Sequence, residues 1–163
     1  MENSDLVEVT VQGVALDNER KHPVVLLKPE EDEDVLPIWI GTAEAAAIFT
    51  VLAGRSFERP MTHDLLKIVI DVLGAKVERI EITGIQNDTY FARVVLKRGE
   101  EIFYIDARPS DSIALALRAR APLFIDRGLF NSYKRHIDLG NDSDDVKKRL
   151  KDMDPGDFGE FDF

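Results

Sequence analysis

The stretch KVERIEITGIQNDTYFARVVLKRGEEIFYID, residues 76–106, decides the fold because it has the pattern of three consecutive β-strands. In its first part Val77, Ile80 and Ile82 alternate with polar residues, as in a half-buried strand. Turn sequences follow at 87–88 (Asn-Asp) and at 98–100 (Arg-Gly-Glu). We therefore predict strands over residues 76–86, 90–97 and 102–106, paired as a β-meander.

A second meander is predicted at the start of the chain. Residues 6–16 place Val7, Val9 and Val11 on one face, and residues 23–28 and 35–41 are two further strands joined by an acidic loop. Pro37 lacks a backbone donor, so its strand should lie at the edge of the sheet or bulge there.

Three helices are predicted between and after the meanders. Thr42, Thr62 and Ser110 are expected to cap helices over residues 43–53, 63–73 and 111–121. Gly54 and Gly74 are expected to end the first two in a left-handed conformation. The second helix carries an apolar stripe at 65, 66, 69, 70 and 73.

With a short last strand at residues 122–125, the order is β-β-β-α-α-β-β-β-α-β, which indicates an α+β fold with a mixed or antiparallel sheet. We expect one domain over residues 1–137 and a mobile acidic tail over 138–163, with one possible helix at 144–153.

The composition narrows the classes of function. The chain has no cysteine, which excludes disulfides, thiolate zinc sites and a cysteine nucleophile. The first residues are acidic and polar, and no apolar run approaches the length of a membrane span, so we expect a cytoplasmic protein without membrane contact.

The net charge of -10 at first argues against a nucleic-acid partner. Its distribution weakens that objection. Residues 30–34 and 138–163 carry the whole excess of acids, and the rest of the chain has equal numbers of acidic and basic residues.

Three stretches together resemble the bifunctional nuclease family: LPIWIG at 36–41 followed by Glu44, RPMTHDLL at 59–66 and DARPSDSIALA at 106–116. The resemblance implies an α+β nuclease that acts on both RNA and DNA with little sequence preference and that forms homodimers. Residues 138–163 do not match the C-terminal interaction motif of some members.

Each of these stretches places an acid in the first turn of a predicted helix: Glu44, Asp64 and Asp111. An acid there gains about 0.3–1 kcal/mol from the helix dipole without any further role. Alternatively, the three helix starts converge, and the carboxylates hold Mg²⁺ or Mn²⁺ for phosphodiester hydrolysis.

The remaining candidates stand beside these acids. His63 could act as a general base or as a ligand, or be an ordinary exposed histidine at a helix start. Arg59 and Arg108 could clamp a phosphate, or form salt bridges with Asp64 and Asp111. Thr62 and Ser110 could bind phosphate at the helix starts.

Two functions therefore compete. A metal-dependent nuclease predicts that Glu44, Asp64 and Asp111 come within reach of one ion. A non-catalytic homodimeric binding module would use the same residues to maintain the fold or hold a small anion, while its acidic tail engages a basic partner. The second function predicts that Arg59 and Arg108 are buried in ion pairs.

Overall fold

The computed structural model describes residues 5–17 and 21–137 and contains seven strands and four helices in that part of the chain. The strands are β1 (Leu6–Asp17), β2 (His22–Pro29), β3 (Leu36–Trp39), β4 (Lys76–Gln86), β5 (Thr89–Arg98), β6 (Glu101–Ala107) and β7 (Leu123–Asp126). The helices are α1 (Thr42–Leu52), α2 (Thr62–Val72), α3 (Pro109–Ala119) and α4 (Arg127–Tyr133).

All seven strands belong to one mixed sheet in the order β3-β2-β1-β7-β4-β5-β6. Each predicted meander forms one half of it, and β7 joins the halves by pairing antiparallel with β1 and parallel with β4. The α+β class and the order of elements are thereby confirmed. As Pro37 required, β3 lies at one edge of the sheet.

Two differences concern the C-terminal part. Helix α4 was not predicted; it is only seven residues long and begins where Asp126 accepts a hydrogen bond from the backbone N–H of Leu129 (2.9 Å). The possible helix over 144–153 lies outside the described residues. No helix in the described ranges has the length and apolar character needed to cross a membrane.

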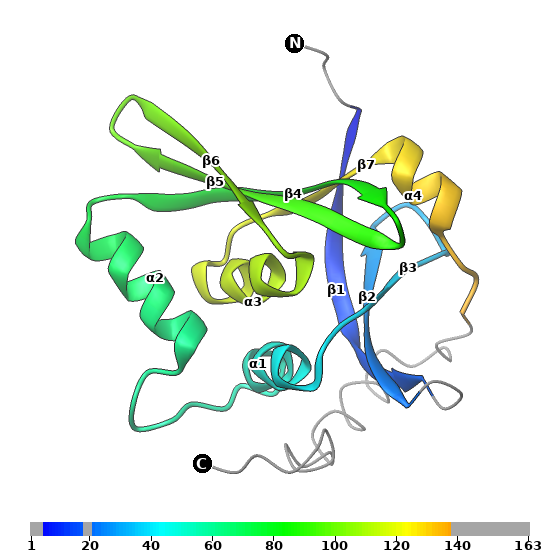
Figure 1. Cartoon of the computed structure of the whole chain (residues 1–163), viewed down its shortest axis with the longest axis horizontal. Helices are drawn as coiled ribbons and strands as arrows, with labels where there is room; N and C mark the ends of the chain where they lie inside the picture. The colour runs from blue at the N-terminus through cyan, green and yellow to red at the C-terminus, as the bar shows by residue number, and fades with distance from the viewer. Residues whose placement is uncertain (1–4, 18–20, 138–163) are drawn as a thin grey trace.

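The core lies between the sheet and two of the helices. Figure 1 shows α1 and α3 side by side in the space between the steep strands β1–β3 and the strands β4–β6 that cross above them. Helix α1 packs against β1 and β2, and α3 packs against β4 and β5. Because α1 and α3 also contact each other, their starts are held close together.

The predicted turns are confirmed. Asn87 and Asp88 both have positive φ, at 49° and 58°, as a two-residue hairpin between β4 and β5 requires. Gly54 and Gly74 follow α1 and α2 with φ of 65° and 73°.

The predicted side-chain caps are wrong. The N-cap residues are Gly41, Met61 and Arg108, none with a side-chain hydrogen bond into its helix. Helix α3 begins at Pro109, whose fixed φ suits the first helical position, so Ser110 lies inside the helix. At the start of α2 the Asp64 side chain takes part in capping, because it accepts a hydrogen bond from the Met61 backbone N–H (2.9 Å).

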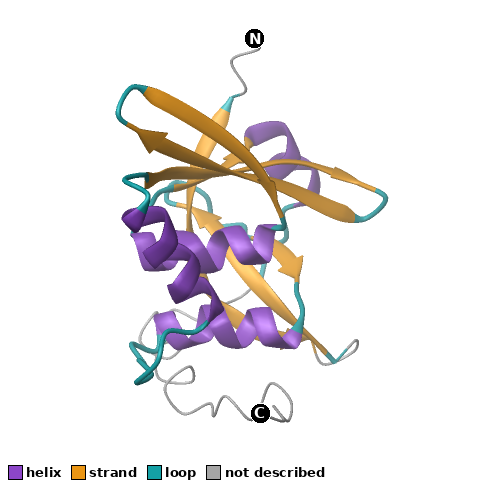
Figure 2. Ribbon diagram, turned by 60° about the vertical axis from the view of Figure 1, so that its left-hand side comes forward, coloured by secondary structure: helices purple, strands orange, loops and turns teal. Residues whose placement is uncertain are grey.

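Helix α2 lies at the margin of the molecule. It packs against α3 and touches β4. In Figure 2, where the left-hand side of Figure 1 comes forward, α2 lies at the front of the helices. Of its predicted apolar stripe only Ile70 is buried, while the other four residues are exposed. The half-buried residues of α2 are instead polar ones, His63, Asp64 and Lys67.

Candidate active site on three helices

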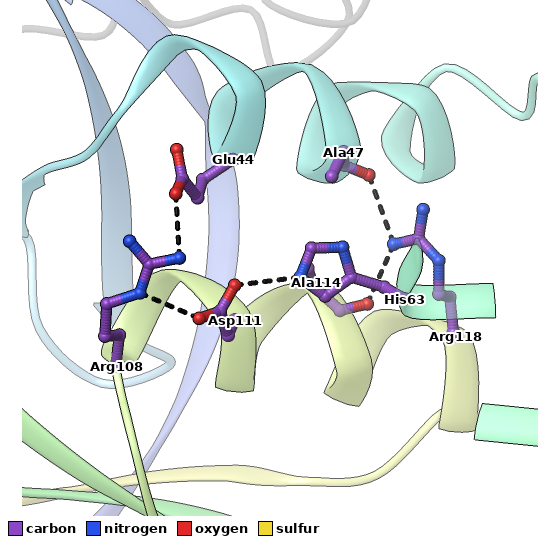
Figure 3. A network of polar contacts seen from close by, with 7 residues as sticks. All are labelled: Glu44, Ala47, His63, Arg108, Asp111, Ala114 and Arg118. Carbon is purple, nitrogen blue, oxygen red and sulfur yellow. Dashed lines mark hydrogen bonds and ion pairs between the residues drawn. The ribbon is translucent and has the colours of Figure 1, made fainter. Parts of the chain in front are cut away.

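A network of charged side chains joins α1, α2 and α3 on the helix side of the sheet. Figure 3 shows Arg108, Asp111 and Arg118 along α3, facing Glu44 and Ala47 of α1, while His63 reaches in from α2. The network brings Glu44, His63 and Asp111 together, whereas Asp64, the acid at the start of α2, pairs with Arg118 instead.

The first part of the network is a chain of four side chains. His63 Nε2 lies 3.0 Å from Oδ1 of Asp111. The other oxygen of Asp111 accepts a hydrogen bond from Arg108 Nε (2.8 Å), and Arg108 Nη2 lies 2.8 Å from Glu44 Oε1. Arg108 thus holds the first acids of α1 and α3 together while its own side chain is 64% exposed.

The second part surrounds Arg118, whose side chain is only 7% exposed. Its Nε donates to Asp64 Oδ1 (2.5 Å), and its Nη1 donates to the carbonyl oxygens of Ala47 (3.1 Å) and Ala114 (2.9 Å). A single arginine therefore ties α1, α2 and α3 to one another. Two of its three partners are backbone carbonyl oxygens, one on α1 and one on α3 itself.

The pKa values of the two aspartates follow from these contacts. Burial acts to raise the pKa of Asp111, but hydrogen bonds from Arg108 and His63 outweigh it and hold that pKa below its ordinary value of 3.8. Burial likewise acts to raise the pKa of Asp64, and the Met61 N–H with Arg118 brings it below 3.8. Asp111 in turn raises the pKa of Arg108, with a smaller contribution from Glu44.

The contact between His63 Nε2 and the Asp111 carboxylate assigns the tautomer of the neutral imidazole. An ionised carboxylate can only accept hydrogen bonds, so the proton between His63 and Asp111 belongs to Nε2 of the imidazole. In the neutral ring Nδ1 is then the nitrogen that can accept a proton. The His63 side chain is 12% exposed and that of Asp111 is 33% exposed, so the imidazole is largely shielded from solvent while the carboxylate keeps part of its contact with water.

The other predicted residues lie outside this network. Arg59 is exposed on the loop before α2 and makes no ion pair with any described residue. The predicted bridge between Arg59 and Asp64 is wrong, because Arg118 occupies that carboxylate, whereas the bridge between Arg108 and Asp111 is confirmed. Thr62 is exposed, and Ser110 is buried.

The arrangement does not fit a metal site made of three carboxylates. Glu44 and Asp111 both pair with Arg108, and Asp64 pairs with Arg118. In the described part of the chain no three His, Asp or Glu side chains form a group that could hold an ion.

A cavity of about 360 Å³ opens beside Asp64 and Arg118. Its lining includes Arg55, Phe57 and Pro60 from the loop that connects α1 to α2. This volume lies within the range of small-ligand sites, and it places the loop of the second motif next to the network.

Arg118 is the member of the network that the sequence reasoning missed. It follows Asp111 by seven residues and Ala114 by four, so all three lie on one face of α3. That spacing could have shown that Arg118 shares a face with the acid at the helix start. The choice of Asp64 as its partner depends on how α2 packs, which no spacing along α3 reports.

The comparisons with known proteins cover the part of the chain that holds the three motifs. Residues 25–138 match the bifunctional nuclease domain family. An uncharacterized protein of Mycobacterium tuberculosis is 37% identical over 122 residues, covering 75% of this chain and 73% of that protein.

Plant proteins are more distant relatives. Bifunctional nuclease 1 of Arabidopsis thaliana is 27% identical over 134 residues, covering 79% of this chain and 41% of the plant protein. Bifunctional nuclease 1 of Oryza sativa subsp. japonica is 28% identical over 110 residues, covering 65% of this chain and 33% of that protein. The match over residues 25–138 takes in all three helices that build the charged network, and this chain belongs to the bifunctional nuclease domain family.

Proposed function

We propose that this chain is a cytoplasmic nuclease that hydrolyses phosphodiester bonds of RNA and DNA with little sequence preference, and that it works as a homodimer. The observation that carries the proposal is the pair formed by His63 and Asp111, with Arg108 bound to the same carboxylate. The plant relatives named bifunctional nucleases support the same class of reaction.

In this proposal His63 is the general base. Asp111 accepts the Nε2 proton and thereby orients the ring, which leaves Nδ1 to take a proton from the nucleophile. DNA has no 2′-hydroxyl group, so one mechanism for both nucleic acids cannot use that group, and in this proposal the nucleophile is water. Asp111 also stabilises the imidazolium that forms when His63 is protonated.

Arg108 is proposed to bind the phosphate. Its guanidinium group is more than half exposed and already contacts two carboxylates with separate nitrogens, as a planar fork does. A phosphodiester offers equivalent paired oxygens. Binding would exchange one anionic partner of Arg108 for another and place the phosphorus atom near His63.

We also propose that cleavage requires Mg²⁺ or Mn²⁺. Because Arg108 pairs with both Glu44 and Asp111, these two carboxylates could bind an ion only after Arg108 has moved away from them. Phosphate binding by Arg108 is one event that would release them.

The second candidate is a non-catalytic homodimeric binding module. It is favoured by the pairing of Glu44, Asp64 and Asp111 with arginines, since ion pairs between helices can serve the fold alone. Its prediction of two buried arginines is wrong, because Arg108 and Arg59 are both exposed.

The test compares purified wild-type protein with two single variants on labelled single-stranded RNA and DNA. His63→Gln removes the proposed base, and His136→Gln is the matched control, because His136 also contacts an aspartate, with its Nδ1 3.2 Å from Asp34 Oδ1. Each is assayed with Mg²⁺, with Mn²⁺ and with chelator. Circular dichroism shows whether both variants fold.

We expect His63→Gln to lower cleavage by about 100-fold or more, the usual contribution of a general base, and His136→Gln to keep the wild-type rate. Equal cleavage by all three proteins would reject His63 as the base. Wild-type protein that cleaves neither nucleic acid under any condition would favour the binding module. Activity that survives the chelator would reject the metal requirement.

A further inference from the structure

Two apolar surfaces remain exposed to solvent in the described part of the chain. One is strand β6, which pairs with β5 on one side and forms the edge of the sheet on the other. Residues 102–105 (Ile-Phe-Tyr-Ile), four of its seven, are exposed, although Arg98 lies over the Phe103 ring and Arg93 over the Tyr104 ring. A long apolar edge strand is a ready template for pairing with another chain.

The other surface is the outer face of α2. Val72 is 79% exposed and Leu73 64%, and Leu65, Leu66, Ile68 and Val69 are exposed as well. His63, Asp64 and Lys67 of the same helix are half-buried instead. A helix with its apolar side in water indicates a protein contact, because isolated soluble molecules rarely expose apolar patches of this extent.

We propose that a second copy of this chain covers both surfaces, through antiparallel pairing of β6 with β6 about a two-fold axis at Tyr104. This gives the homodimer of the proposed function a defined interface. Tyr104 is the midpoint of Glu101–Ala107, so this register lets every residue of the strand pair with a residue of the other copy.

The side chains of β6 fit this register. Phe103 and Ile105 lie on the core face of the sheet, because their partners on β5, Leu96 and Val94, belong to the hydrophobic core. Across the two-fold axis Phe103 would lie opposite Ile105, an aromatic and β-branched pair that stabilises antiparallel strands. The two Tyr104 side chains would meet on the other face.

The charges favour the same register. Glu101 would lie opposite Ala107, and Asp106 opposite Ile102, so no like charges face each other. A shift of two residues toward the β5–β6 turn would set Glu100 against Asp106, which is repulsive. A shift of two residues the other way would leave Glu101 and Ile102 opposite residues beyond the end of the strand.

The pairing also connects the interface to the proposed active site. Arg108 directly follows β6, and His63 and Asp64 lie on the inner face of α2. The two-fold register brings the β5–β6 turn of one copy to the end of β6 in the other, beside Arg108. Covering α2 from outside would hold its inner face, with His63, against α3.

Disulfide trapping tests the register, because the natural chain has no cysteine. Residues directly opposite in an antiparallel pair have Cα atoms about 4.5–5.5 Å apart, within the range that a disulfide spans. Full-length Tyr104→Cys protein should therefore form a covalent dimer on mild oxidation. Ile102→Cys is the matched control, because four residues of strand, about 14 Å, would separate the two cysteines.

The double variant Phe103→Cys/Ile105→Cys provides a second trap, since these positions would lie opposite each other. Light scattering of the untreated wild-type protein measures the oligomeric state in parallel. A dimer that is trapped at 104 and by the 103/105 pair, but not at 102, is the expected result. A wild-type monomer, or a dimer trapped by none of these cysteines or equally at 102, would overturn the proposal.

These outcomes are independent of those for catalysis. A monomer that cleaves RNA with His63 as its base would leave the proposed chemistry intact and remove the interface. A trapped dimer that cleaves neither nucleic acid would support the interface and reject the proposed chemistry. Coverage of α2 by residues 138–163 of the same chain would give a monomer and would therefore count against the second copy.

Discussion

At the scale of single residues, Arg118 and Arg108 illustrate two uses of the same side chain. Arg118 is buried and shares its donors between a carboxylate and two carbonyl oxygens, so its loss would leave acceptors without donors inside the protein. Arg108 is exposed, and its carboxylate partners could turn to water. Stability should depend on the first arginine and substrate binding on the second.

For Arg118→Gln we expect a loss of roughly 2–3 kcal/mol in the free energy of unfolding, below the full value for a buried pair because Asp64 is about one-third exposed. Urea denaturation measures it. Arg98→Gln is the control, since its pair with Glu101 is exposed on both sides and such pairs contribute about 0–1 kcal/mol. Similar losses in the two variants would contradict a structural role for Arg118.

The aspartates predict how stability depends on acidity. The pKa values of Asp64 and Asp111 lie below 3.8 in the folded protein, so their contribution is fully present above about pH 4 and is lost as the pH falls through the lower, folded values. Unfolding free energies between pH 6 and pH 2.5 should therefore decline. Asp111→Asn should show a shallower decline, and an unchanged slope would mean that other groups cause it.

The contacts between individual side chains were the part of the structure that the sequence predicted least well. Glu44, His63, Asp111 and Arg108 could be selected because each stands near the start of a predicted helix. Their pairing could not, since it depends on the packing of α1 against α3 and of α2 against α3. The sequence placed Arg59 near Asp64, but three-dimensional packing brought Arg118 there instead.

At the scale of elements, alternation and turn residues predicted all seven strands, because both are local properties of the chain. Helix α4 was missed since it is too short to show a helical period. The apolar stripe of α2 was predicted correctly as a stripe, but a period shows only that one face is apolar. It cannot show whether that face meets the core of the same molecule or another chain.

The β4–β5 hairpin offers a test of local backbone preference. Asp88 has a φ of 58°, in the left-handed region that glycine adopts without a steric cost. We expect Asp88→Gly to raise the free energy of unfolding by up to about 1 kcal/mol and Asp88→Val to lower it by about 1–2 kcal/mol, both read from urea denaturation. Opposite signs would mean that the turn relaxes to another type.

At the scale of the whole molecule, self-association would couple stability to concentration. A dimer that dissociates on unfolding has a Tm that rises with protein concentration. We expect this rise for the wild type and its loss in Val72→Glu, which places a charge on the apolar face of α2. Leu16→Glu, at an exposed leucine on β1, should retain it. A Tm independent of concentration in all three proteins would argue against the dimer.

The position of β7 in the sheet affects how this chain folds during its synthesis on the ribosome. Strands β1–β3 emerge first and β4–β6 later, but the two halves join only through residues 123–126, which are synthesised near the end of the described domain. Until then the nascent polypeptide holds two small sheets, with β1 and β4 as additional open edges. The interval in which a growing chain can pair wrongly with its neighbours therefore closes only when β7 has been made.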